Sequence, residues 1–184
     1  MINKIAFELT SLICTEAYDN ARDRAKIQYG LSILLSEGFK IISLLIFFNI
    51  LHKERYFYFS MLILLTTRVF SGGVHLRNAL NCLIFTTLFF ILTSIFAPLV
   101  PRQSITLYLS MSMLSLLIVL VRAPICSVRR PIKENNKKLQ YKFIAAASIV
   151  SWTIVLFNLQ STSLVNCGFC TIFLQSIQLV LIKK

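Results

Sequence analysis

The sequence predicts an all-α integral membrane protein with six transmembrane helices preceded by an amphipathic interfacial helix. Of its 184 residues, 57% are hydrophobic, and the mean hydropathy is +0.75. The apolar residues form long runs with few charges, and Lys and Arg collect in alternate connections between these runs. Both patterns exclude a soluble domain. Because the runs leave little chain over, residues 1–184 are expected to form a single membrane domain.

The first 28 residues differ from the rest. Ile2, Ile5, Leu9 and Leu12 recur at helical spacing, with charged residues between them. This pattern is typical of a helix that lies in the membrane interface, and we expect one within residues 1–28. No uninterrupted apolar core or small-residue cleavage site follows the first charges, so a signal peptide is not expected.

Six apolar runs approach the length needed to cross a bilayer core, which is about 20 residues of helix. The second run has only about 15 residues. This favours a following glycine segment that dips into the membrane and lines a cavity enclosed by protein. The predicted transmembrane helices cover 31–51, 56–70, 79–98, 104–121, 143–159 and 162–182.

The net charge of +12 is a topology signal first. Four Lys or Arg precede the first span, two lie in 68–77, seven in 122–142, and two end the chain; only three lie in the alternate connections. The positive-inside rule then places both termini, the 71–78 connection and the basic loop 122–142 in the cytoplasm. We therefore expect anionic lipids or an acidic peptide, and not nucleic acid, as partners.

One polar stretch, RVFSGGVHLRNALNC, runs from Arg68 to Cys82. On a helix that begins near His75, Cys82 would lie two turns on, about 10 Å along the axis. That is too far for proton transfer, so either the histidine must bend back or bound substrate must close the gap. The paired Gly72 and Gly73 permit such a bend, because glycine enters positive-φ conformations freely.

A histidine can take the proton of a cysteine thiol and so create the reactive thiolate. Cys82 and His75 are therefore the predicted catalytic pair, with Arg68 able to bind a carboxylate or developing oxyanion charge. Spacing alone supports equally well a buried small cysteine, an interfacial histidine and an arginine that sets topology. Cys126, on the same predicted side as His75, is the competing nucleophile.

Two further groups of charged residues are candidates for supporting roles. Glu37 and Lys40 lie three residues apart inside the first apolar run, where a local ion pair and active-site support are equally favoured. In the basic loop, either a solvated anchor or a binding strip for an acidic substrate is expected. The loop residues expected to contact substrate are Arg129, Arg130, Lys133, Lys137 and Lys138.

The remaining motifs predict no cofactor and no metal. Cys167 and Cys170 form C-x-x-C at the start of the last span, with no second ligand pair, so packing is favoured over redox or metal chemistry. Serine-hydrolase, Walker A and dinucleotide-binding motifs are absent from the sequence.

Together these residues resemble the accessory gene regulator B (AgrB) family of membrane cysteine endopeptidases in Gram-positive quorum sensing. The resemblance rests on R-x6-H-x6-C at Arg68, His75 and Cys82, on Gly73, and on Ala123–Pro124 at the start of the basic loop. A later Pro131 and a lysine-rich run also agree, and length and segment count extend the likeness over nearly the whole chain.

The resemblance implies that Cys82 is the nucleophile and His75 its general base. The substrate would be a small AgrD-type propeptide with an amphipathic leader, a central Cys or Ser, and an acidic tail. Removal of the tail through an acyl-enzyme thioester would give a cyclic thiolactone, or a lactone from serine. The resemblance also implies membrane lipids as partners and a homodimer as one assembly state.

Two other classes of function compete with this one. A small multi-pass transporter or exporter would use Glu37, Lys40 and Arg68 along a polar pathway and would not need Cys82. Against it, the polar residues gather at the predicted cytosolic end and no internal repeat is seen. A non-catalytic membrane partner in a signalling complex is the third class.

Overall fold

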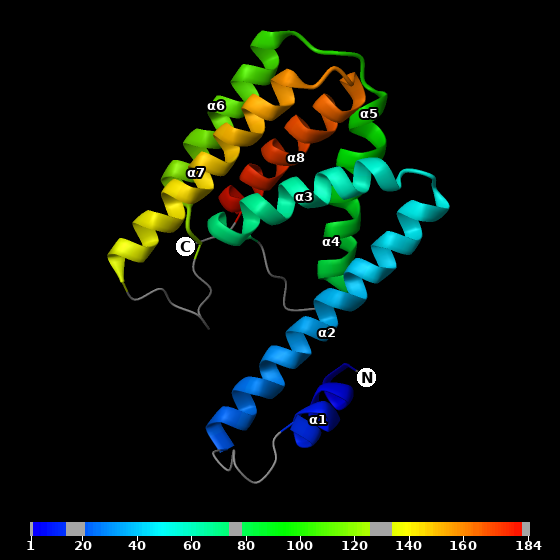
Figure 1. Ribbon diagram of the computed structural model, residues 1–184, viewed down its shortest axis with the longest axis vertical. Helices are drawn as coiled ribbons and strands as arrows, with labels where there is room; N and C mark the ends of the chain where they lie inside the picture. Colours follow the sequence, from blue (N-terminus) through cyan, green and yellow to red (C-terminus); the bar gives the residue numbers. More distant parts are fainter. Residues whose placement is uncertain (1, 14–20, 74–78, 126–133, 182–184) are drawn as a thin grey trace. The chain divides into compact units, whose positions relative to one another are not determined.

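The computed structural model describes residues 2–13, 21–73, 79–125 and 134–181, and all regular secondary structure in these ranges is helical (Figure 1). The helices separate into two compact units, residues 1–50 and 51–184. The first unit contains α1 (Ile2–Ile13) and α2 (Ala21–Ile50). The fold class is therefore confirmed as all-α.

Within the first unit, α1 packs against α2 through a narrow face. Ala6 is fully buried and Thr10 nearly so, while Ile5 and Phe7 remain exposed. The α2 helix begins ten residues before the first predicted span and has 30 residues, about 45 Å of helix. Its early turns are polar and its later turns apolar, so the hydropathy pattern located only the second part.

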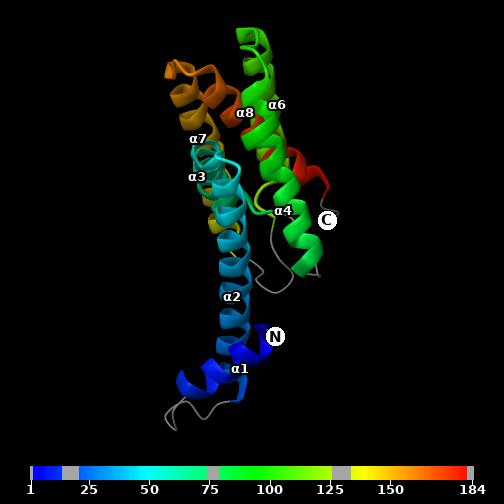
Figure 2. The same cartoon turned by 90° about the vertical axis from the view of Figure 1, so that its right-hand side faces the viewer.

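The second unit holds the remaining helices, in which a π-helical turn, η1, interrupts one long segment. Its helices α6, α7 and α8 lie side by side in both views (Figure 1 and Figure 2). The bounds are α3 (Glu54–Ser71), α4 (Ala79–Ile91), η1 (Leu92–Phe96), α5 (Ala97–Leu99), α6 (Ile105–Arg122), α7 (Asn135–Asn158) and α8 (Thr162–Leu181).

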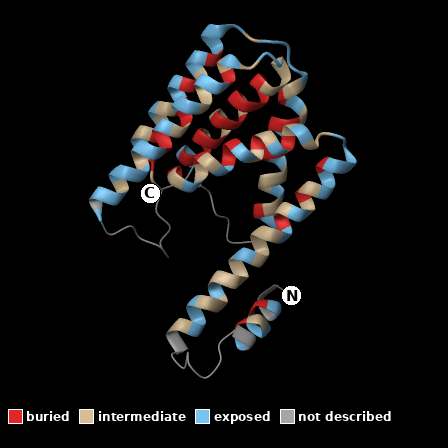
Figure 3. Cartoon of the chain, viewed as in Figure 1, coloured by how far each residue is buried: buried red, intermediate tan, exposed pale blue. Residues whose placement is uncertain are grey.

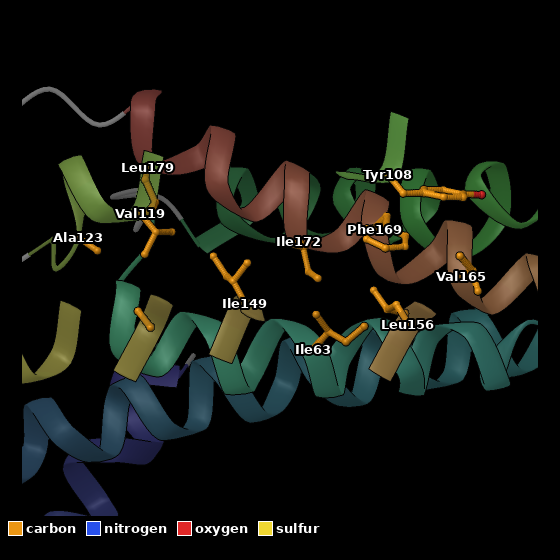
Figure 4. Packing of buried hydrophobic residues seen from close by; sticks show 11 residues of the cluster. Ile63, Tyr108, Val119, Ala123, Ile149, Leu156, Val165, Phe169, Ile172 and Leu179 are labelled. Atoms are coloured by element: carbon orange, nitrogen blue, oxygen red, sulfur yellow. The ribbon is translucent and has the colours of Figure 1, made fainter. Parts of the chain in front are cut away.

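Helix α8 is the centre of this unit. Most of its residues are buried, whereas α6 and α7 turn broad apolar faces outward (Figure 3). Figure 4 shows Ile63 of α3 and Ile149 of α7 meeting Phe169 and Ile172 of α8. At Gly168 a Cβ atom would overlap the Leu156 side chain, so glycine permits the close approach of α7 to α8.

One group of small polar side chains inside the unit forms hydrogen bonds among its members. Ser60 of α3 lies 2.9 Å from the Cys167 sulfur and 3.2 Å from the Thr171 hydroxyl. Ser94, carried by η1, donates to the same Ser60 oxygen at 3.3 Å. In an apolar environment such small polar contacts hold helices together.

The second unit has two well-defined ends. At one end, Asn166 of α8 donates to the carbonyl of Val100, and the Cys167 sulfur lies 3.5 Å from the carbonyl of Tyr56 near the start of α3. At the other, α3 and α6 end together and Phe70 faces Tyr141 of the early α7. The start of α3, the end of α5 and the start of α8 therefore lie at one end, and the ends of α3 and α6 lie at the other with the early α7.

Five of the described helical segments are long and apolar enough to cross a membrane, which fits a membrane protein. They are 23–50, 80–99, 105–122, 136–158 and 162–181. The short α3 is not among them, because its 18 residues include Glu54, Arg55 and Arg68. The predicted count of six spans and the interfacial placement of α1 stay predictions.

Candidate active site

Along the chain, the candidate site begins with the turn that ends α3. Gly72 has φ +83°, a left-handed conformation that glycine adopts readily, and its N–H donates to the Arg68 carbonyl at 2.9 Å. Gly72 therefore has the positive-φ conformation that the double glycine permits, while the return of His75 toward Cys82 stays a prediction. The turn directs the chain away from α3 immediately before the segment that contains His75.

This turn is packed against the start of the basic loop. The Ile125 N–H donates to the Ser71 carbonyl at 3.1 Å, and a Cβ atom at Gly72 would lie 2.8 Å from the Ile125 carbonyl oxygen. Ile125 directly follows Ala123–Pro124. Two motifs that are some fifty residues apart in the sequence thus form one structural element.

Arg68 and Gly73 are also in contact. A Cβ atom built on Gly73 would lie 2.5 Å from the Arg68 Nε and 2.9 Å from its Cζ, so the guanidinium rests on the glycine backbone. Any larger residue at Gly73 would have to displace the guanidinium. The structure therefore gives a physical reason why this arginine and this glycine occur together.

Cys82 lies in the first turn of α4, which begins at Ala79. The residue is buried, with only 7% of its surface exposed. Its carbonyl accepts a hydrogen bond from the Thr86 hydroxyl at 2.7 Å, so its backbone belongs to a regular helix. A buried thiol near a helix start is held in place and is shielded from bulk water.

His75 lies outside the described residues, so its predicted two-turn separation from Cys82 stays a prediction. Arg129, Arg130 and Lys133 of the basic loop lie outside them too, as does the competing Cys126. Lys137 and Lys138 are described, and they belong to the first turns of α7, because this helix begins at Asn135. The helix starts eight residues before the apolar run that predicted it, since its first two turns are polar.

Glu37 and Lys40, in the first unit, form an ion pair at 2.5 Å. The lysine side chain is 7% exposed and the glutamate side chain 44%. Pairing across one helical turn neutralises a buried cation locally, so the ion pair of the structural alternative is present. Their support of an active site stays a prediction.

The C-x-x-C cysteines have separate surroundings. Cys167 is fully buried against Ser60, and Cys170 lines an apolar groove of about 330 Å³ between α5, α6 and α8. This groove lies at the opposite end of the unit from the Gly72 turn. Within the described ranges, no cluster of three His, Cys, Asp or Glu could hold a metal ion.

One residue of the site escaped the sequence analysis. Gln175 of α8 is 2% exposed, and its Nε2 donates to the Gly72 carbonyl at 3.0 Å. A polar residue within an apolar span is itself a signal for function or for helix packing. Hydropathy averaging hides it, because Gln175 and Gln178 are only two positions in a run of 20 residues.

Comparisons with known proteins identify the family that this chain resembles. The family model for accessory gene regulator B matches residues 2–179. A protein of Clostridium beijerinckii described as AgrB-like is 34% identical over 162 residues, covering 88% of this chain and 79% of the relative. A second AgrB-like protein, from Clostridium perfringens, is 30% identical over 167 residues, 85% of this chain and 75% of its own.

No solved structure matches the chain. The family match nevertheless extends over almost all of the sequence, from the start of α1 to Leu179 in α8, and includes every candidate residue above. The chain therefore belongs to the accessory gene regulator B family, and this membership supports a role in the agr quorum-sensing system.

Proposed function

We propose that this chain is a membrane cysteine endopeptidase that removes the C-terminal tail of a small AgrD-type propeptide and cyclises the remainder. The family, in which cysteine-protease-like processing of peptides is general, implies this class of partner. The observation that carries the proposal is the buried Cys82 thiol in the first turn of α4. Along the sequence, the Arg68–Gly73 contact comes before the short segment that contains His75, and Cys82 comes after it.

In the first step, His75 takes the proton of the Cys82 thiol, and the thiolate attacks the carbonyl carbon of the scissile peptide bond. The carbon–nitrogen bond breaks, and the histidine returns the proton to the departing amine. The acidic tail leaves, and an acyl-enzyme thioester remains. Arg68 has the charge to stabilise the oxyanion or to bind a substrate carboxylate.

In the second step, a cysteine within the bound propeptide attacks the thioester carbon. Its thiol proton passes through His75 to the Cys82 sulfur, which is released, and the product is a cyclic thiolactone. An internal serine would give a lactone. Exchange of one thioester for another changes the free energy little, whereas hydrolysis of the thioester would release the energy of that bond without forming the ring. The burial of Cys82 supports this route, because it keeps water from the intermediate.

The topology belongs to the same proposal. The α3 helix would supply the sixth span, with Glu54 and Arg55 at one membrane edge and Arg68 at the other. At the Arg68 end the described cations also include Arg122, Lys137 and Lys138. The positive-inside rule then puts this end and both termini in the cytoplasm, with α1 in the interface. A homodimer is part of this proposal.

A trapping experiment tests the two-step reaction. The propeptide is co-expressed with its internal Cys or Ser changed to Ala, so the thioester cannot be transferred. We expect a covalent adduct on the full-length enzyme, with the mass of the leader and ring segment, that hydroxylamine removes. Release of the tail without any adduct on wild-type enzyme would contradict an acyl-enzyme route.

The basic end of the protein gives a second prediction. The double change Lys137→Glu and Lys138→Glu should raise the KM for a propeptide with an acidic tail by about tenfold at low salt, since each exposed charge contributes about 0.2–1 kcal/mol. Lys137 pairs with Glu134, but both side chains are more than half exposed, so loss of that pair should change stability little. KM is measured with purified enzyme in lipid vesicles.

Arg102→Glu is the matched control, because Arg102 precedes α6 at the opposite end of the unit. Its KM should equal that of wild type. A rise in salt should weaken substrate binding by wild type and by the Arg102 variant, and much less by the double variant. An equal KM for all three proteins would exclude this end as the tail-binding surface.

A further inference from the structure

A buried glutamine on α8 holds the turn that ends α3. The Gln175 Nε2 donates to the Gly72 carbonyl at 3.0 Å and lies 3.4 Å from the Ser71 hydroxyl. The residue is 2% exposed. An apolar side chain of the same length would fill the space but would make neither contact.

The turn needs such a donor because carbonyls at a helix end have no partner within the helix. The Ser71 carbonyl receives the Ile125 N–H, and the Gly72 carbonyl receives Gln175 and the Ser71 hydroxyl, the latter at 3.2 Å. Because Ser71 and Gln175 are both buried, water would not readily replace a lost donor between them. Without the amide, Gly72 would lose its strongest tie to α8.

The other end of the amide is unsatisfied. Gln175 Oε1 is buried and has no hydrogen-bond partner among the described residues, which disfavours the amide on packing grounds alone. Gln178, about one turn further on, is 4% exposed and has an Oε1 in the same state, but it makes no hydrogen bond to the described Ser71 or Gly72. The two glutamines separate the effect of a buried amide from that of a bond to the turn.

We propose that Gln175 is a positioning residue for the acyl transfer. By fixing Gly72, it sets the direction in which the chain leaves α3, and with it the Arg68–Gly73 contact. It touches none of the reacting atoms and acts through the turn. This inference rests on the proposed function, because its effect is defined on the processing reaction.

The first test compares Gln175→Met with Gln178→Met. Methionine has a similar length and keeps the packing, but it removes the amide. We expect kcat for propeptide processing to fall about tenfold in the Gln175 variant, and to stay within about twofold of wild type in the Gln178 variant. Both should insert in the membrane in wild-type amounts. Equal kcat values for the two variants would overturn the inference.

The second test uses pH. In Gln175→Glu, a protonated carboxyl can donate to the Gly72 carbonyl, whereas a carboxylate cannot, and a buried carboxyl keeps its proton well above pH 4. The kcat of this variant relative to wild type should therefore rise as pH falls from about 9 to about 6. The ratio for Gln175→Met should stay constant. A ratio for the Glu variant that stays at the Met value throughout would also overturn the inference.

Cys82→Ala, measured in parallel, distinguishes failure of the proposed role of Gln175 from failure of the proposed function. If it is inactive while Gln175→Met has the wild-type kcat, only the role of Gln175 is lost. If Cys82→Ala processes the propeptide normally, the proposed function itself is excluded.

Discussion

Replacement of Cys82 by alanine should lower propeptide processing by about 10⁴-fold or more, because alanine cannot form the acyl-enzyme thioester. The fold should survive, since alanine removes only the sulfur from a site that is 7% exposed. Processing is measured by mass spectrometry of a co-expressed propeptide, and insertion by the amount of full-length protein in the membrane fraction.

Two other cysteines complete this test, one as a matched control and one as the competing nucleophile. Cys170→Ala changes a half-buried thiol in α8 at the opposite end of the unit and should leave processing unchanged. Cys126→Ala tests the competing nucleophile that follows Ile125 in the chain. Normal processing by both Cys82→Ala and Cys126→Ala would leave the non-covalent exporter or the signalling partner as the remaining functions. Loss of processing in Cys126→Ala alone would transfer the nucleophile to that residue.

Much of the helical architecture could be predicted from local patterns in the sequence. Three of the predicted ranges lie within two residues of the described helical ends, because in these segments the apolar run and the helix have the same length. They are 79–98, 104–121 and 162–182. Where helices extend past the apolar run, as at the starts of α2 and α7, prediction of the start failed. A polar helical turn has no hydropathy signal.

The candidate site was predictable only in part, for a similar reason. The bend at Gly72 and the pairing of Glu37 with Lys40 depend on near neighbours, so the residue types indicated both. The contacts of Gly72 with Ile125 and Gln175 join positions about 50 and 103 residues apart. No periodicity in one segment encodes such contacts. The family pattern identified the neighbouring residues Gly73 and Ala123–Pro124, but it gave no physical reason for them.

The same substitution at three glycines should give three different results. Gly72→Ala should be the most harmful, because the residue has φ +83° and the new Cβ would meet a backbone oxygen, that of Ile125, at 2.8 Å. Strain of this kind is worth about 1–3 kcal/mol, and the turn before His75 would have to move. We expect processing to fall by about a hundredfold and the melting temperature in detergent to drop.

Gly73→Ala should separate activity from stability. Its Cβ would meet the end of the Arg68 side chain, at 2.5 Å from Nε, and a flexible guanidinium can move aside. The melting temperature should stay near wild type, while processing falls about tenfold if the guanidinium position serves the reaction. Gly38→Ala is the control, because its new Cβ would meet no atom of the described residues within 4 Å apart from its chain neighbours and the backbone of its own helix. Alanine also favours a helix interior by about 1 kcal/mol. The Gly38 variant should process normally with equal or greater stability.

Full activity in Gly73→Ala would show that Arg68 has no part in catalysis at this position. Full activity in Gly72→Ala would show that the turn itself does not place the catalytic segment.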